Sequence, residues 1–142
     1  MTNPQLLVLA ASSQVLLTII VLLLLGARRG RAVKANKHGS DALLNDRAWP
    51  ADVLQVSNNY KSQFEMPVLF FAAIATALAI HVATVVLVWL AWGFVAARLV
   101  HSVCHCGSNR LPVRFASFFA SVVTVTIMWA MLASHVFSTG TT

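Results

Sequence analysis

The chain has 142 residues, of which 58% are hydrophobic and only 10% are charged, and its mean hydropathy is +0.78. This composition excludes a water-soluble domain, which must keep charged side chains on its surface. The formal net charge is +6. Because the basic residues flank apolar stretches and form no soluble recognition element, we expect them to contact anionic lipid headgroups and not nucleic acid.

Four long apolar stretches follow one another along the chain. About 20 apolar residues in a helix cross the hydrocarbon core of a bilayer, and each stretch comes close to that length. We therefore predict an all-α integral membrane four-helix bundle that occupies residues 1–142 as a single domain. The expected membrane spans are residues 5–27, 64–82, 85–103 and 113–137.

The first stretch has no basic residue before it and no clear cleavage site, so it is expected to remain as a span. Every lysine and arginine of the chain lies between Arg28 and Arg114, in or beside two connections. The positive-inside rule places both connections in the cytoplasm. Both termini are then expected on the other side, which is the periplasm if the protein resides in a bacterial inner membrane.

The second helix is expected to begin at the sequence Trp49-Pro50-Ala51-Asp52. Proline suits the first turn of a helix, and an early aspartate complements the helix dipole. The pattern predicts that this helix continues into the apolar run that starts at Val68. Pro67 lies inside it and lacks an amide hydrogen, so we expect a bend where the carbonyl of Gln63 loses its partner.

Glu65 is the only acidic residue next to a span. It shares a helical face with Asn58 and Lys61. A carboxylate near hydrocarbon needs a cation, water or a proton, and this requirement is typical of functional sites. An ion pair between helices or a contact with lipid headgroups would explain the residue equally well.

Basic residues at helical spacing end the third span, and more follow across a Gly-Ser-Asn turn: Arg98, His101, His105, Arg110 and Arg114. If the helices are neighbours, these side chains face Glu65 around one cytoplasmic cleft. Arginine clamps carboxylates and lowers the pKa of a nearby thiol because it stabilises the anion. The alternative is that the arginines are topology anchors with headgroup partners.

The two cysteines lie in the same region, and histidine and thiolate are both zinc ligands. Cys104, His105 and Cys106 point in different directions around a helix, however, so no metal site is expected. In a reducing compartment we expect both cysteines to be free thiols.

The segment Asn58–Phe70, which reads NNYKSQFEMPVLF, resembles the second-helix signature of the MAPEG family, the membrane-associated proteins in eicosanoid and glutathione metabolism. Arg98-Leu-Val-His101, Arg110-Leu-Pro-Val-Arg114 and the basic run with Arg28 and Arg29 are also similar to the family. The resemblance covers nearly the whole chain. It implies four spans and assembly as a homotrimer.

In glutathione-using members, which this resemblance evokes, the tripeptide lies between adjacent subunits near the cytoplasmic side. The resemblance implies that Arg114 stabilises the thiolate. It further implies glutathione-binding roles for seven residues: Arg28, Arg29, Asn59, Glu65, Arg98, His101 and Arg110. The chain departs from these enzymes where His105 and Phe118 replace tyrosines, and where Lys61 stands in a segment that is usually rich in arginine.

Two hypotheses about function follow. The first is a membrane-bound glutathione-dependent transferase or peroxidase-like protein, with a lipophilic electrophile that enters from the bilayer. The second is a family member without catalysis, a structural or accessory subunit that contacts lipids or other membrane proteins in a larger assembly. It predicts that the polar residues pair with each other and leave no cleft.

Overall fold

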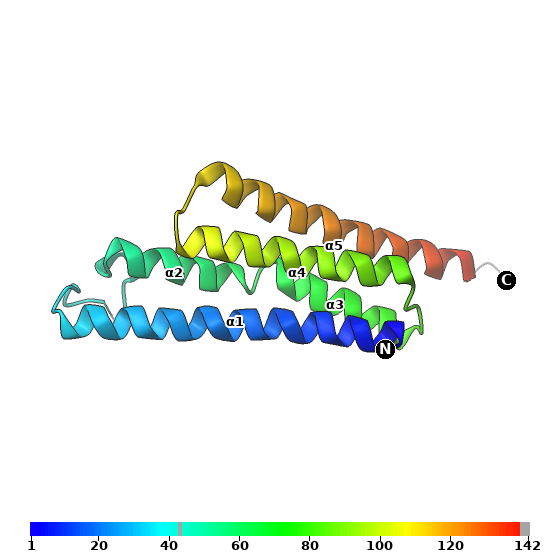
Figure 1. The fold of residues 1–142 in the computed structure, drawn as a ribbon, viewed down its shortest axis with the longest axis horizontal. Helices are drawn as coiled ribbons and strands as arrows, with labels where there is room; N and C mark the ends of the chain where they lie inside the picture. The colour runs from blue at the N-terminus through cyan, green and yellow to red at the C-terminus, as the bar shows by residue number, and fades with distance from the viewer. Residues whose placement is uncertain (43, 140–142) are drawn as a thin grey trace.

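The computed structural model describes residues 1–42 and 44–139, and all regular structure in them is helical (Figure 1). The elements are α1 (Asn3–Lys34), a short 3-10 helix η1 (Asp46–Ala48), α2 (Ala51–Ser62), α3 (Met66–Ala79), α4 (Val85–Cys106) and α5 (Leu111–Thr139). Four segments of the described chain are long and apolar enough to cross a membrane: α1, α2 with α3, α4, and α5. The predicted all-α four-helix membrane bundle is thus confirmed.

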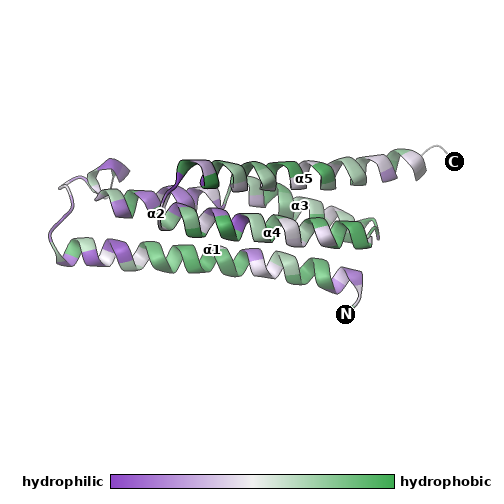
Figure 2. Cartoon of the chain, turned by 45° about the horizontal axis from the view of Figure 1, so that its top comes forward, coloured by the Kyte–Doolittle hydropathy of each residue, from purple (hydrophilic) through white to green (hydrophobic). Residues whose placement is uncertain are grey.

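The helices run along the long axis of the bundle, and the start of α1 lies at the same end as the end of α5 (Figure 1). The opposite end holds the end of α1, the connector to α2, α2 itself and the turn between α4 and α5. We call this the basic end. Hydrophilic residues gather there, whereas the rest of the helices is mostly hydrophobic (Figure 2). α1 continues beyond Ala27 to Lys34, so much of the first basic run is helical.

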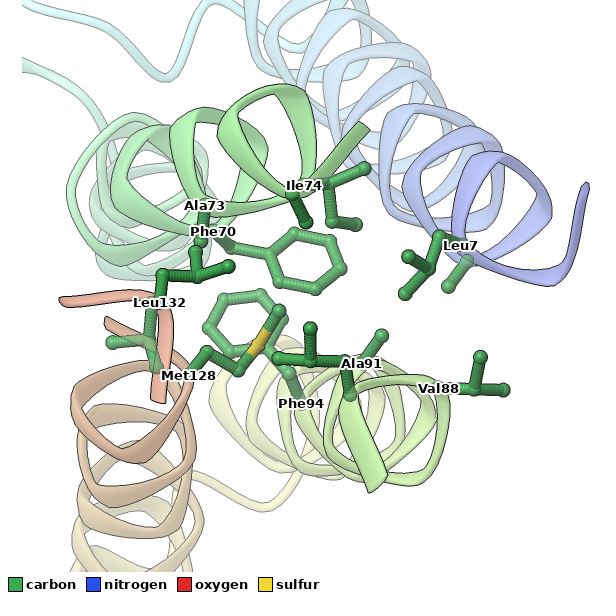
Figure 3. Packing of buried hydrophobic residues seen from close by; sticks show 13 residues of the cluster. Leu7, Phe70, Ala73, Ile74, Val88, Ala91, Phe94, Met128 and Leu132 are labelled. Carbon is green, nitrogen blue, oxygen red and sulfur yellow. The ribbon is translucent and has the colours of Figure 1, made fainter. Parts of the chain in front are cut away.

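An apolar core joins the helices in the half of the bundle away from the basic end. Phe70 of α3 and Phe94 of α4 stack at its centre, with ring centroids 4.2 Å apart and planes inclined by 8°. Further side chains surround the pair: Leu7, Ala73, Ile74, Val88, Ala91, Met128 and Leu132 (Figure 3). Because lipid tails are as apolar as these side chains, close packing, and not the expulsion of water, holds the helices together here.

The second span differs from the single bent helix predicted from the sequence, because residues 63–65 separate α2 from α3. Pro67 lies in the first turn of α3, where no amide donor is needed. The amides of residues 63 and 64 bond to carbonyls three positions earlier, at 3.0 and 2.9 Å. The carbonyl of Ser62 accepts a hydrogen bond from the Arg98 Nη2 at 2.9 Å. A side chain of α4 therefore satisfies the end of α2.

The connector between α1 and α2 is held by one carboxylate. Asp46 accepts hydrogen bonds from Lys61 of α2 and Arg29 of α1, the latter at 3.3 Å. The Arg29 guanidinium also lies over the Trp49 ring, 5.2 Å from its centroid. The hydrogen bond from Lys61, aided by the charge of Arg29, lowers the pKa of Asp46 below its ordinary value.

Candidate functional site

A pocket of about 340 Å³ opens at the basic end between α2, α4 and α5. We call it the basic-end pocket. Three of the site residues predicted from the sequence line it, namely Glu65, His101 and Arg114. The remaining lining residues are Asn58, Ser62, His105, Leu111, Phe115 and Phe118. The pocket therefore combines a carboxylate, a guanidinium and two imidazoles with apolar walls.

Arg114 lies near the start of α5, and the preceding turn orients it. Its Nη1 donates to the Asn109 Oδ1 at 2.8 Å. Asn109 has a φ of 49°, a left-handed conformation that asparagine tolerates better than most residues, and its amide bonds the carbonyl of Cys104 at 2.7 Å. This turn places the guanidinium beside the pocket.

Two histidines of α4 form a hydrogen-bonded pair in the pocket wall. The His101 Nδ1 lies 3.0 Å from the carbonyl oxygen of Arg114. The His105 Nδ1 lies 3.3 Å from the His101 Nε2, and the two rings meet edge to face at 87°. Their spacing of four residues along a helix was visible in the sequence, but it did not by itself assign His105 a role.

Glu65 lies in the break between α2 and α3 and is exposed. Among the described residues its carboxylate takes part in no ion pair or side-chain hydrogen bond. The break thus presents an accessible negative charge at the edge of a cationic pocket, where it can attract an ammonium group.

Arg98 lies directly behind the pocket wall and is fully buried. Its Nη2 donates to the carbonyl and the hydroxyl of Ser62, at 2.9 and 3.1 Å, and Ser62 lines the pocket. The Arg98 Nε and Nη1 have no hydrogen-bond partner within residues 1–42 and 44–139. A buried cation with two free donors favours an anion nearby, because its charge acts through a medium of low dielectric constant.

Two predicted ligands on α1 have partners elsewhere in the chain. Arg28 donates to the carbonyls of Asp52 and Cys106, at 2.7 and 2.8 Å, and so ties α1 to the start of α2 and the end of α4. Arg29 pairs with Asp46 of the connector. Neither lines the basic-end pocket of its own chain.

Asn59 belongs to a buried network of polar side chains between α1, α2 and α4. Its Nδ2 donates to the Cys106 Sγ at 3.1 Å. The Gln63 Nε2 donates to the Ser102 Oγ at 3.0 Å, and the Gln63 Oε1 accepts from the Gln14 Nε2 at 3.0 Å. The sequence did not predict this network, although Gln14, in the middle of the first apolar stretch, was a signal for it.

Arg110 lines a different groove, of about 690 Å³, on the outer side of α4 and the start of α5. Its other lining residues are mostly apolar and include Leu99, Val103 and Val113.

Cys104 borders the same groove, and both it and Cys106 are free thiols. Among the described residues, no three histidine, cysteine or acidic side chains come together in a way that could hold a metal ion.

The comparison with protein families matches the sequence profile of the MAPEG family to residues 6–134. No curated protein and no solved structure matches the chain in the corresponding searches. The matched range includes most of each of the four spans and the lining of the basic-end pocket. The family groups integral membrane proteins with glutathione-related transferase and peroxidase activities. The chain is a member of the MAPEG family.

Proposed function

We propose that this protein is a membrane-bound, glutathione-dependent enzyme that conjugates glutathione to lipophilic electrophiles or reduces them. The observation that carries the proposal is the basic-end pocket, because Arg114, Glu65 and His101 all line it. Family membership supplies the reaction class, and the pocket supplies a place for it. The accessory-subunit hypothesis predicted no cleft at this position.

The residues of the pocket fit an anionic thiol that also carries an ammonium group, as glutathione does. Arg114 offers a guanidinium for the thiolate or a carboxylate, and Glu65 offers an acceptor for the ammonium. Arg98 adds positive charge behind the wall, with two buried donors unused among the described residues. Glutathione would supply the nucleophilic sulfur. Arg114 would favour the thiolate because a fixed cation stabilises an anion most strongly where water is excluded.

The apolar side of the pocket suits the second substrate. Leu111, Phe115 and Phe118 form this side, and Phe115 is exposed on the bundle surface. A lipophilic electrophile dissolved in the bilayer can therefore approach the pocket without crossing water. In this arrangement α5 contributes both the cation and the apolar wall, which holds the two reactants near each other.

We further propose that the active form is a homotrimer in which adjacent subunits complete the glutathione site. The pocket is open on the surface of the single chain, and several predicted ligands, among them Arg28 and Arg110, lie outside it. Cations from a neighbouring subunit would extend the site. Chemical crosslinking in membranes, followed by native mass spectrometry of the detergent-solubilised protein, should yield a species of three chains. A monomer under both conditions would refute this part of the proposal.

The proposed location is a bacterial inner membrane, with the basic end in the cytoplasm and both termini in the periplasm. Two observations support this orientation: hydrophilic residues gather at the basic end (Figure 2), and every lysine and arginine lies between Arg28 and Arg114. Reporter fusions to each terminus, one active only in the cytoplasm and one only in the periplasm, test it. Termini on opposite sides, or either in the cytoplasm, would overturn the orientation.

The enzymatic proposal is tested by conjugation of glutathione to a small chloronitroaromatic electrophile. Loss of a hydrogen bond to a charged group costs about 1.5–3 kcal/mol, so Arg114→Ala should lower kcat/KM about 10- to 150-fold. Arg47→Ala is the matched control, because Arg47 is an exposed arginine of η1, in the connector at the basic end. Equal rates for the Arg114→Ala and Arg47→Ala proteins, or no turnover by the wild type, would contradict the proposal.

A further inference from the structure

The hydrogen bonds of the two pocket histidines determine which nitrogen of each ring carries a proton. A carbonyl oxygen can only accept, so the His101 Nδ1, which lies 3.0 Å from the carbonyl oxygen of Arg114, must donate. In a neutral ring the other nitrogen is then an acceptor. The His101 Nε2 therefore accepts a hydrogen bond from the His105 Nδ1, 3.3 Å away.

The same reasoning fixes the free nitrogen of His105. With its proton on Nδ1, the neutral His105 ring carries an unprotonated Nε2 with a lone pair. This atom has no hydrogen-bond partner in the described part of the chain, and His105 lines the basic-end pocket. The backbone carbonyl of Arg114 thus determines, through His101, that the His105 Nε2 is unprotonated. This proton acceptor lies in the same pocket as the Arg114 guanidinium.

We infer that His105 is the general base of this site and takes the proton from the thiol of the bound substrate. The inference rests on the proposed function. In the step, the S–H bond breaks, an N–H bond forms at the His105 Nε2, and the sulfur keeps the electron pair as a thiolate. The imidazolium later releases its proton to water at the mouth of the pocket. No oxidant, metal or further reactant is needed for this transfer.

No other side chain of the pocket is as well suited to this step. Both ring nitrogens of His101 are engaged, and the hydroxyl of Ser62 accepts a hydrogen bond from Arg98. Glu65 is an available carboxylate, but it is exposed at the edge of the pocket and is the proposed acceptor for the ammonium group. His105 therefore offers a nitrogen lone pair in the pocket wall that no other group of the described chain occupies.

Other charged groups around His105 bear on its pH dependence. Those facing it are Glu65 from the α2–α3 break, His101 and Arg98 from α4, and Arg114 from α5. Because these groups are coupled in one pocket, the base is assigned by substitution and not by the position of an acid limb in the kcat profile.

The test compares His105→Asn with His81→Asn in the purified protein. Asparagine places an amide donor near the position of the His105 Nδ1, so the bond to His101 can persist while the base is removed. His81 is exposed in the α3–α4 turn with a φ of 59°, which asparagine tolerates, and it is far from the pocket. We expect His105→Asn to lower kcat for conjugation about 10²-fold or more, with glutathione affinity within about twofold of the wild type. His81→Asn should match the wild type in both.

Each outcome of this test has a distinct meaning. A His105→Asn protein that binds glutathione and turns over like the wild type overturns the base while leaving the proposed function intact. A wild type without glutathione binding overturns both. If His105→Asn does not fold, His105→Gln decides: a kcat lowered about 10²-fold or more with glutathione affinity retained supports the base, and turnover like the wild type refutes it.

Discussion

Phe94 of α4 is the side chain whose truncation we expect to destabilise the bundle most. It is fully buried and stacks on Phe70 with centroids 4.2 Å apart, so it joins α4 to α3 (Figure 3). Truncation of a buried phenylalanine to alanine costs about 3–5 kcal/mol in water-soluble proteins. Part of that cost arises because the phenylalanine ring of a water-soluble protein meets water when the protein unfolds. This part is absent here, because separated helices stay in an apolar medium. The cavity and the lost aromatic pair, worth about 0.5–1.5 kcal/mol, remain.

We therefore expect Phe94→Ala to lower the free energy of unfolding by about 2–3 kcal/mol, and Phe94→Leu, which fills most of the volume, by less than about 1.5 kcal/mol. The assay is unfolding of the protein in mild detergent by added dodecyl sulfate, followed by tryptophan fluorescence. Phe119→Ala is the matched control, because Phe119 is 58% exposed on the outer face of α5. A loss of less than about 0.5 kcal/mol for Phe94→Ala, or one no larger than that of the control, would refute the packing argument.

Two further predictions concern the connector and the buried polar network. The pKa of Asp46 is lowered by Lys61, so its contribution to stability is present above the unfolded value of 3.8 and is lost as the pH falls through the folded pKa. Proteolysis of the connector should accelerate as the pH falls from neutral to about pH 3. The Asp46→Asn protein should be cleaved rapidly at every pH, and cleavage of this variant that depends on pH as strongly as in the wild type would contradict the prediction. Gln14→Leu leaves the buried Gln63 Oε1 without its donor and should cost about 1 kcal/mol in the dodecyl sulfate assay. Ser12→Leu, at an exposed position, should cost nothing measurable, and equal losses for both would show that the hydrogen bond is not responsible.

The fold was largely predictable from the sequence because hydrophobic length and charge position determine where helices cross a bilayer. The break at residues 63–65 was not, because a proline within a helical pattern is compatible with a bend or with a complete break. What decides between them is a tertiary contact, namely the hydrogen bonds from Arg98 to Ser62 that satisfy the end of α2. No local pattern around Pro67 reports that Ser62 has a partner 36 residues farther along the chain.

The candidate site was predictable only in part, for a related reason. Helical spacing shows which residues share a face of one helix, as for His101 and His105, but it does not give the rotation of one helix relative to its neighbours. The structure places Arg114 beside the histidine pair and Arg110, four residues earlier, at a different groove. It also assigns Arg28 to backbone carbonyls within the chain. These placements depend on packing that a single sequence does not specify.

Binding of glutathione by Arg114 in the basic-end pocket can be measured by isothermal titration of the purified protein in detergent. We expect a saturable heat for the wild type and a dissociation constant at least about tenfold higher for Arg114→Ala, which corresponds to about 1.4 kcal/mol. Arg47→Ala should bind like the wild type. An absence of heat at millimolar glutathione, or an affinity unchanged by Arg114→Ala, would show that the pocket does not bind glutathione through Arg114.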